Sequence, residues 1–226
     1  MKRFRFVFFL LTLISLSSCI EIIDDLYINS DGSGTFKYNI NLSSSKVKIN
    51  SLLALDSLDG KKVPSINEIS LKINRVVDSL ELQDGISNVS FESDYNNFLF
   101  KLKCDFSSLE SLQIAIKNVV RAEVKGQTFP ELEYEWIHFE SDTLIRSVPQ
   151  ITIKKTNDLK PEDIKLLKQG KYTSITRFDK EIIDFENINA HLSKSKKAIM
   201  VKTDAYSLVQ FPNLLDNSIY LVKSEN

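Results

Sequence analysis

Apolar and polar residues alternate along several short segments of the chain, and this period of two predicts β-strands. Over residues 35–42 every even-numbered residue is apolar and every odd-numbered one is polar. Residues 20–28 also have isoleucine or leucine at positions 20, 22, 26 and 28, and the glycine-rich turn 31–34 between the segments predicts a β-hairpin. Similar patterns predict strands over 86–93, 97–106, 131–139, 143–148, 171–178, 182–185, 198–203 and 219–222.

Two longer segments carry apolar residues at helical spacing instead. The first spans 66–80 and begins beside Ser65 and Glu68, which have the spacing of a capping box. The second spans 109–120, and residues 107–110 predict a second capping box before it. Both segments are therefore expected to be amphipathic helices with one face on the core.

The order of these elements predicts the fold class. Hairpins separated by single helices favour an α+β fold, an antiparallel sheet of hairpins with two or three helices packed on one face. Shorter helices are expected from Pro161 and over 204–209, while 43–64 fits either a loop or a short helix. Residues 19–226 are expected to form a single domain, and 150–160 is the one region that suggests a subdomain break.

Composition narrows the class of protein. The chain has 226 residues, of which 42% are hydrophobic, and its 29 basic and 30 acidic side chains give a net charge of −1. This is typical of a globular protein, and the missing basic excess argues against a nucleic-acid partner. Residues 1–18 contain three basic residues and no acid, so the other 208 residues carry 26 basic and 30 acidic side chains.

That basic start belongs to a targeting pattern. Lys2, Arg3 and Arg5 precede a mostly apolar run over 6–16, which is typical of a secretory signal peptide and short for a membrane span. The run ends in Leu16, Ser17, Ser18 and Cys19.

These four residues resemble a bacterial lipobox. The resemblance implies export, cleavage before Cys19 and lipid attachment to the Cys19 thiol, so that residues 1–18 are a lipoprotein signal peptide. A membrane would then be the first partner, through lipidated Cys19. The alternative is an ordinary signal peptide in which Cys19 occurs by chance.

A second resemblance lies at the start of the body, by which we mean residues 19–226. Residues 19–21, followed by Asp31-Gly32-Ser33-Gly34-Thr35-Phe36, resemble the opening of uncharacterised Bacteroidota envelope lipoproteins. A lipidated cysteine that leads into a hairpin and an α+β body is also similar to the LppM-type lipoprotein domain. These resemblances imply a place in the cell envelope, in the outer membrane on its periplasmic or surface side. They supply no catalytic residues.

Side chains that could carry chemistry are few. The chain lacks the nucleophile elbow, the phosphate-binding loop and the zinc-protease motif. His138 and His191 stand apart in the sequence, and Cys104 shares its strand face with apolar residues, which predicts a core position. We therefore expect no catalytic residue, no metal site and no cofactor.

One pattern of charged residues has two interpretations. Glu131, Glu133 and Glu135 would form an acidic row on one face of the strand predicted over 131–139. A solvated strand face is the favoured interpretation, and a cation or a basic partner is the alternative.

The leading hypothesis is a membrane-anchored envelope lipoprotein that is not an enzyme and that binds or scaffolds another envelope component, protein or lipid. One alternative is a carrier of a hydrophobic ligand, which predicts an apolar cavity of several hundred cubic ångströms. The other is a hydrolase with a dispersed carboxylate site, which predicts two convergent carboxylates in a pocket.

Overall fold

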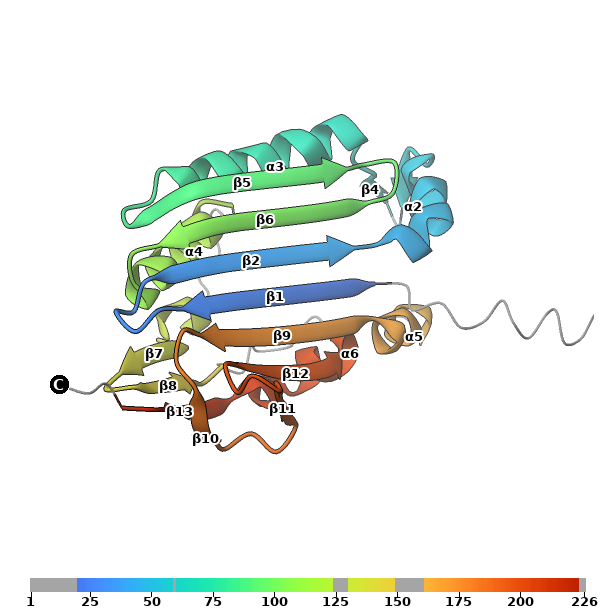
Figure 1. Ribbon diagram of the computed structural model, residues 1–226. Helices are drawn as coiled ribbons and strands as arrows, with labels where there is room; N and C mark the ends of the chain where they lie inside the picture. Colours follow the sequence, from blue (N-terminus) through green and yellow to red (C-terminus); the bar gives the residue numbers. More distant parts are fainter. Residues whose placement is uncertain (1–19, 59, 124–129, 149–160, 224–226) are drawn as a thin grey trace, which may run out of the picture.

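The computed structural model describes residues 20–58, 60–123, 130–148 and 161–223, without the side chains of 130, 131, 162 and 163. Its main element is a seven-stranded sheet, drawn across the centre of Figure 1. In spatial order the strands are β11 (Ala190–Leu192), β12 (Ala198–Asp204), β9 (Lys171–Phe178), β1 (Glu21–Ile28), β2 (Gly34–Asn41), β6 (Leu99–Phe106) and β5 (Ile86–Asp94). All neighbours are antiparallel except β1 and β9, which run parallel.

A second sheet of four antiparallel strands lies beside one end of the first. Its order is β10 (Ile182–Phe185), β13 (Asn217–Leu221), β8 (Thr143–Arg146) and β7 (Ile137–Glu140). The remaining two strands of the described residues, β3 (Ser57–Leu58) and β4 (Lys61–Lys62), form a separate hairpin.

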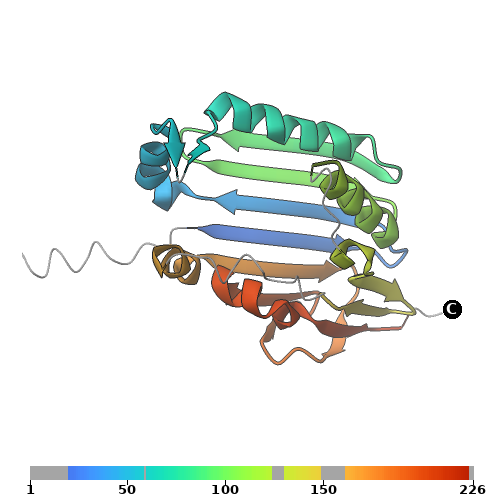
Figure 2. The ribbon, with the colours of Figure 1, turned by 180° about the vertical axis from the view of Figure 1, so that it is seen from behind.

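The helices cover one face of the large sheet, as the view from behind shows (Figure 2). They are α2 (Lys46–Leu53), α3 (Ile66–Glu81), α4 (Leu109–Glu123), α5 (Pro161–Gln169) and α6 (Ala205–Gln210), with short 3-10 turns η2 (Ser43–Ser45), η3 (Pro130–Glu133) and η4 (Pro212–Leu215). The opposite face of the sheet, seen in Figure 1, carries no helix of the described residues.

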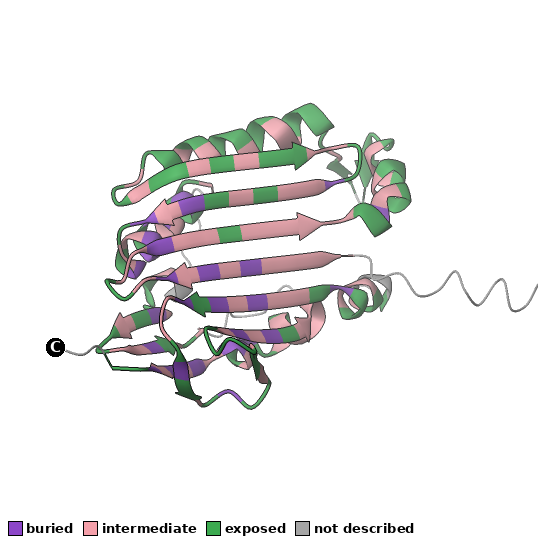
Figure 3. Ribbon diagram, in the orientation of Figure 1, coloured by how far each residue is buried: buried purple, intermediate pink, exposed green. Residues whose placement is uncertain are grey.

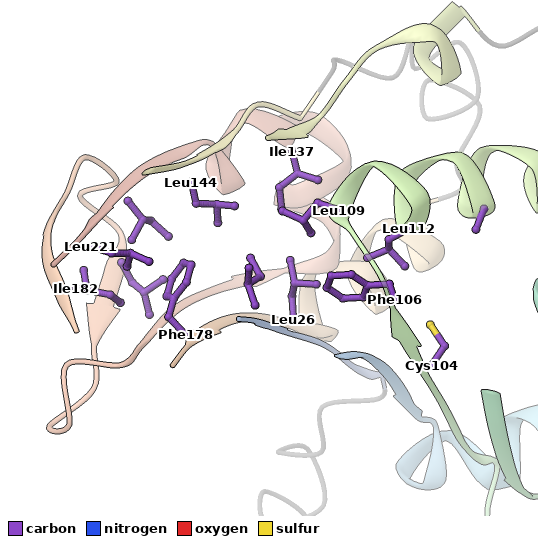
Figure 4. Packing of buried hydrophobic residues seen from close by; sticks show 14 of the residues in the cluster. Leu26, Cys104, Phe106, Leu109, Leu112, Ile137, Leu144, Phe178, Ile182 and Leu221 are labelled. Atoms are coloured by element: carbon purple, nitrogen blue, oxygen red, sulfur yellow. The ribbon is translucent and has the colours of Figure 1, made fainter. Parts of the chain in front are cut away.

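The core lies between this covered face, helix α4 and the second sheet. Leu26 and Phe178 from the large sheet meet Leu112 from α4 and Leu144 from β8, as Figure 4 shows. Buried positions gather on β1, β9, β12 and the second sheet, while α2 and α3 are largely exposed (Figure 3). Cys104 is fully buried in this core, which confirms the position predicted for it.

Local sequence signals explain the helix starts. Ser65 and Glu68 form the predicted capping box of α3, with the Glu68 backbone N–H donating to Ser65 Oγ at 3.2 Å. The second capping box differs from the prediction. The reciprocal pair is Ser108 and Ser111, whose backbone N–H groups each donate to the other's hydroxyl at 3.1 Å.

The predicted α+β class is confirmed, and the hairpins β1–β2, β5–β6 and β7–β8 form as expected. The strand predicted over 131–139 is wrong in its first half, because 130–133 form η3 and the strand begins at Ile137. The parallel β1–β9 pair and the division into two sheets were not predicted. The suggested break near 150–160 lies outside the described residues, which resume at Pro161, the first residue of α5.

Candidate functional site

A buried polar cluster lies at the centre of the covered face of the large sheet. Asp24 on β1 is 5% exposed and sits at an inward position between Ile22 and Leu26. The parallel register places it opposite Ser174 of β9, which is 4% exposed, and Ser174 Oγ donates to Asp24 Oδ2 at 3.0 Å. A carboxylate at this depth needs a positive partner, because burial of an unpaired charge is costly.

Arg146 of β8 supplies that partner from the second sheet. Its Nη1 donates to Ser174 Oγ at 2.7 Å and lies 3.5 Å from Asp24 Oδ2. The Arg146 and Asp24 side chains are 15% and 7% exposed, so the ion pair is shielded from solvent. This cluster therefore connects the two sheets through one carboxylate, one hydroxyl and one guanidinium.

The ion pair leaves two buried polar atoms without a hydrogen-bond partner in the described part of the chain. They are Asp24 Oδ1, an acceptor, and Arg146 Nε, a donor. Nearly all buried polar groups in folded proteins are hydrogen-bonded, and each exception requires an explanation. A bound ligand that donates to one atom and accepts from the other is one explanation that chemistry offers.

Both residues line a cavity of about 150 Å³ between the sheet and α4. Its other lining residues are mostly apolar or aromatic: Leu26, Phe36, Tyr38, Leu112, Gln113, Ile116, Trp136, Ile137 and Tyr172. An apolar wall with a few converging polar groups is the usual lining of a ligand site, although this cavity is smaller than the several hundred cubic ångströms that such sites usually have.

Two tyrosines add polar groups to the wall. Burial, and then the negative charge of Asp24, raise the pKa of Tyr38 and move the pKa of Tyr172 far above its usual value. A side-chain hydrogen bond between Tyr172 and Asp24 adds to the shift in the pKa of Tyr172. Both hydroxyls therefore stay protonated at neutral pH and keep a proton to donate.

Gln113 of α4 holds the outer wall in place. Its side chain is 4% exposed and pairs with the backbone of the residues that lead into β7. Trp136 N–H donates to Gln113 Oε1 at 2.9 Å, and Gln113 Nε2 donates to the carbonyl of Ile137 at 2.7 Å. These bonds fix Trp136 at the cavity, where Lys117 Nζ lies 5.3 Å from its ring centroid.

A wider, polar groove lies at the end of the sheet where the β1–β2 turn meets β7. Asp31, Gly32 and Phe139 line both of its hollows, each of about 550 Å³. The turn itself is held locally, with Ser33 N–H donating to Asp31 Oδ1 at 2.9 Å. Among the described residues no group of three His, Cys, Asp or Glu side chains is placed to hold a metal ion.

His138 belongs to this groove and is not isolated. Its Nδ1 lies 3.1 Å from Glu135 Oε1 and its Nε2 lies 3.2 Å from Glu140 Oε2. Hydrogen bonds to Glu140 and then Glu135 raise the pKa of His138. The expected acidic row does not form as a strand face, because Glu133 lies in η3 and pairs with Arg121 at 2.7 Å, while Glu135 pairs with His138.

The other predicted site residues lie outside the described part of the chain. These are Cys19 and the lipobox residues Leu16, Ser17 and Ser18. The first described residue is Ile20, whose carbonyl accepts a hydrogen bond from the backbone N–H of Lys171 at 2.7 Å. No helix in the described ranges has the length and apolar character that a membrane crossing requires.

Asp24, Ser174 and Arg146 were not predicted as site residues, although the sequence carries a signal for each. Asp24 interrupts the apolar positions of 20–28, and Ser174 and Arg146 likewise occupy inward positions of their strands. A polar residue in the apolar register of a strand is therefore the sign that would have located the cluster.

The two alternative functions, a hydrolase and a carrier of a hydrophobic ligand, predict sites that differ from this cavity. Among the described residues that line the cavity, Asp24 has the one carboxylate, whereas a hydrolase was expected to place two in its pocket. Its volume of about 150 Å³ compares with the several hundred expected for a carrier of a large hydrophobic ligand.

No family model and no curated protein matches the chain. Among solved structures, the chain is similar to the NMR structure of the folded domain of LppM from Mycobacterium tuberculosis. The TM-score is 0.40 and the identity 10%, over 92% of this chain and 92% of that one. A likeness of this size assigns neither a family nor a function.

Proposed function

We propose that the chain is an envelope lipoprotein, tethered by a lipid on Cys19, whose body binds a small ligand in the Asp24–Arg146 cavity. The observation that supports binding is the pair of buried atoms without partners, Asp24 Oδ1 and Arg146 Nε, on residues that line the cavity. Both atoms are buried beside the cavity and do not open into it, so a ligand with one donor and one acceptor would satisfy them once the two side chains turn toward it.

The cavity also indicates the kind of ligand. An apolar cavity of about 150 Å³ accommodates a molecule the size of benzene, and Phe36, Trp136 and Tyr172 offer aromatic contacts. The ligand class is therefore a single ring, or a group of similar size, with a neutral hydrogen-bonding substituent. This proposal makes the body a binding module and not an enzyme.

The tether rests on the lipobox at residues 16–19. Strand β1 begins at Glu21, so only Ile20 separates Cys19 from the centre of the large sheet. Attachment of two or more acyl chains would hold the body at a membrane, because a single chain gives only reversible binding. We place that membrane in the cell envelope, with the outer membrane as the first candidate.

The tether is tested in intact cells with a labelled fatty acid. The parent chain is expected to incorporate label and to fractionate with membranes, and Cys19→Ala is expected to do neither. Absence of label in the parent, or membrane fractionation of Cys19→Ala equal to that of the parent, would overturn the tether.

Ligand binding is tested through Trp136, the single tryptophan of the chain, because it lines the cavity. Benzamide is the probe, since its amide offers a donor and an acceptor on one ring. We expect a saturable change in tryptophan emission that Asp24→Asn weakens. The matched control is Asp25→Asn, because Asp25 belongs to the uncovered face and pairs with Arg177 instead. A linear response to benzamide, or equal titrations for both variants, would contradict the cavity as the binding site.

A further inference from the structure

An exposed apolar and basic surface occupies the end of the body next to Ile20. We call it the α2 surface, and it consists of α2, residues 54–56, and strands β3 and β4. Val47 of α2 is 81% exposed, and Leu55 and Leu58 are each 45% exposed. Large apolar side chains that gather at one end of a body mark a contact surface more often than single exposed ones do.

The position of this surface follows from the strand register. Glu21 pairs with Asn41, the last residue of β2, and the chain passes from there through η2 directly into α2. The α2 surface and the start of β1 therefore lie at the same end of the sheet, at the right in Figure 1 and at the left in Figure 2. Cys19 is covalently one residue from Ile20, so a lipid on Cys19 would bring a bilayer to this end.

The charge of the surface complements acidic headgroups. Lys48 and Lys61 are exposed, and neither has an ion-pair partner among the described residues. Two more lysines have partners: Lys46 donates to Asn97 Oδ1 at 3.2 Å, and Lys62 pairs with Glu68 at 2.6 Å. Asp56 is the acidic residue among the described residues of the surface and is exposed, and the sequence has a second one, Asp59, between β3 and β4.

We propose that the α2 surface docks on the bilayer that holds the lipid of Cys19, with Val47, Leu55 and Leu58 at the headgroup boundary. Exposed apolar residues interleaved with lysines are the composition that binds an anionic membrane surface. The tether supplies a high local concentration of lipid, so that even a weak contact is populated. This inference rests on the tether of the proposed function and is independent of the cavity.

The experiment measures the depth of Val47 on lipidated protein. The full chain is expressed in cells that process lipoproteins, purified with its lipid, and reconstituted in vesicles of phosphatidylethanolamine and phosphatidylglycerol. Val47→Cys carries an environment-sensitive fluorophore, and the vesicles contain lipids with a quencher in their acyl chains. Cys104 does not compete for the label, because it is fully buried and its thiol has a pKa of about 11.

Leu82→Cys is the matched control. Leu82 is 83% exposed, close to the value for Val47, but it follows the end of α3 at the opposite end of the sheet. We expect strong quenching at Val47→Cys and little at Leu82→Cys. Replacing Lys48 and Lys61 by Gln should lower the ratio of docked to free protein by roughly fivefold for each lysine. Lys194→Gln, in the turn before β12 at the far end, should leave it unchanged.

The outcomes separate the two proposals. Protein that floats with the vesicles but shows equal quenching at both labels would overturn docking and leave the tether intact. Protein that carries no lipid and does not float would overturn the tether and docking together. Quenching at Val47→Cys that does not change when Lys48 and Lys61 are replaced would overturn the electrostatic part of the inference.

Discussion

Replacement of Arg146 by Met is the most informative perturbation of the buried cluster. At the observed separation of 3.5 Å, the Coulomb attraction of the pair is about 5 kcal/mol at an effective dielectric constant of about 20. Desolvation of the two charges offsets most of that attraction, so the net contribution of the pair is small. Removal of Arg146 alone leaves the Asp24 charge buried and uncompensated, which costs about 3–5 kcal/mol.

Urea unfolding of the parent and the variants at neutral pH measures this cost. Arg146→Met should lower the free energy of unfolding by the full amount, and a second change, Asp24→Asn, should recover a large part of it because no buried charge remains. The control is Arg177→Met, whose side chain is 45% exposed and pairs with Asp25 on the uncovered face. That surface pair should contribute about 1 kcal/mol or less. If Arg146→Met costs no more than Arg177→Met, the account of a shielded ion pair is wrong.

Three further predictions test other parts of the structure. Cys104 should resist thiol reagents in the folded protein at pH 8, where a pKa of about 11 leaves about one thiol in a thousand ionised, and should react at once in urea. The pKa of His138, followed by NMR, should lie above 6.5 and fall in Glu140→Gln. Because the folded-state pKa is raised, the contribution of His138 to stability is complete below the unfolded-state pKa of about 6.5 and is lost as the pH rises through the higher folded-state pKa. Gly34→Ala should destabilise the protein by about 3 kcal/mol or more in the same urea assay, because the added Cβ would lie 1.9 Å from the carbonyl oxygen of Tyr27; a loss below about 1 kcal/mol would show that β1 and β2 separate easily there.

Much of the fold follows from local sequence patterns. The alternation over 35–42 and the turn before it predict the β1–β2 hairpin, and the register pairs Ile28 with Gly34 across that turn. Ser65 likewise marks the start of α3 at the residue where the capping box forms. These features depend on neighbours in the chain, which is why a sequence without any comparison is sufficient to predict them.

Features that depend on distant residues could not be predicted in this way. In the segment 131–136 glutamates alternate with apolar or aromatic residues, which is the pattern of a strand. Gln113 of α4, however, provides the hydrogen bonds that set the path of this segment into β7. The pairing of His138 with Glu140 follows only once the strand is known to begin at Ile137. The parallel partner of β1 comes from residues 171–178, far along the chain, and periodicity does not encode that choice.

The candidate site also depends on residues that are distant in the chain, but one of its residues is marked in the sequence. Asp24 occupies an inward position of a strand that is otherwise apolar there, and so breaks the pattern that predicts the strand. A fold gains nothing from a lone carboxylate in its core, so the sequence implies a buried partner for Asp24 even where it does not name one. The structure supplies Ser174 and Arg146 from two different sheets, and one oxygen of Asp24 still lacks a partner among the described residues. A pair kept only for stability could be replaced by apolar side chains at little cost. In the proposed function the ligand completes the hydrogen bonding of Asp24, and comparison of Asp24→Asn with Asp25→Asn in the tryptophan titration tests that proposal.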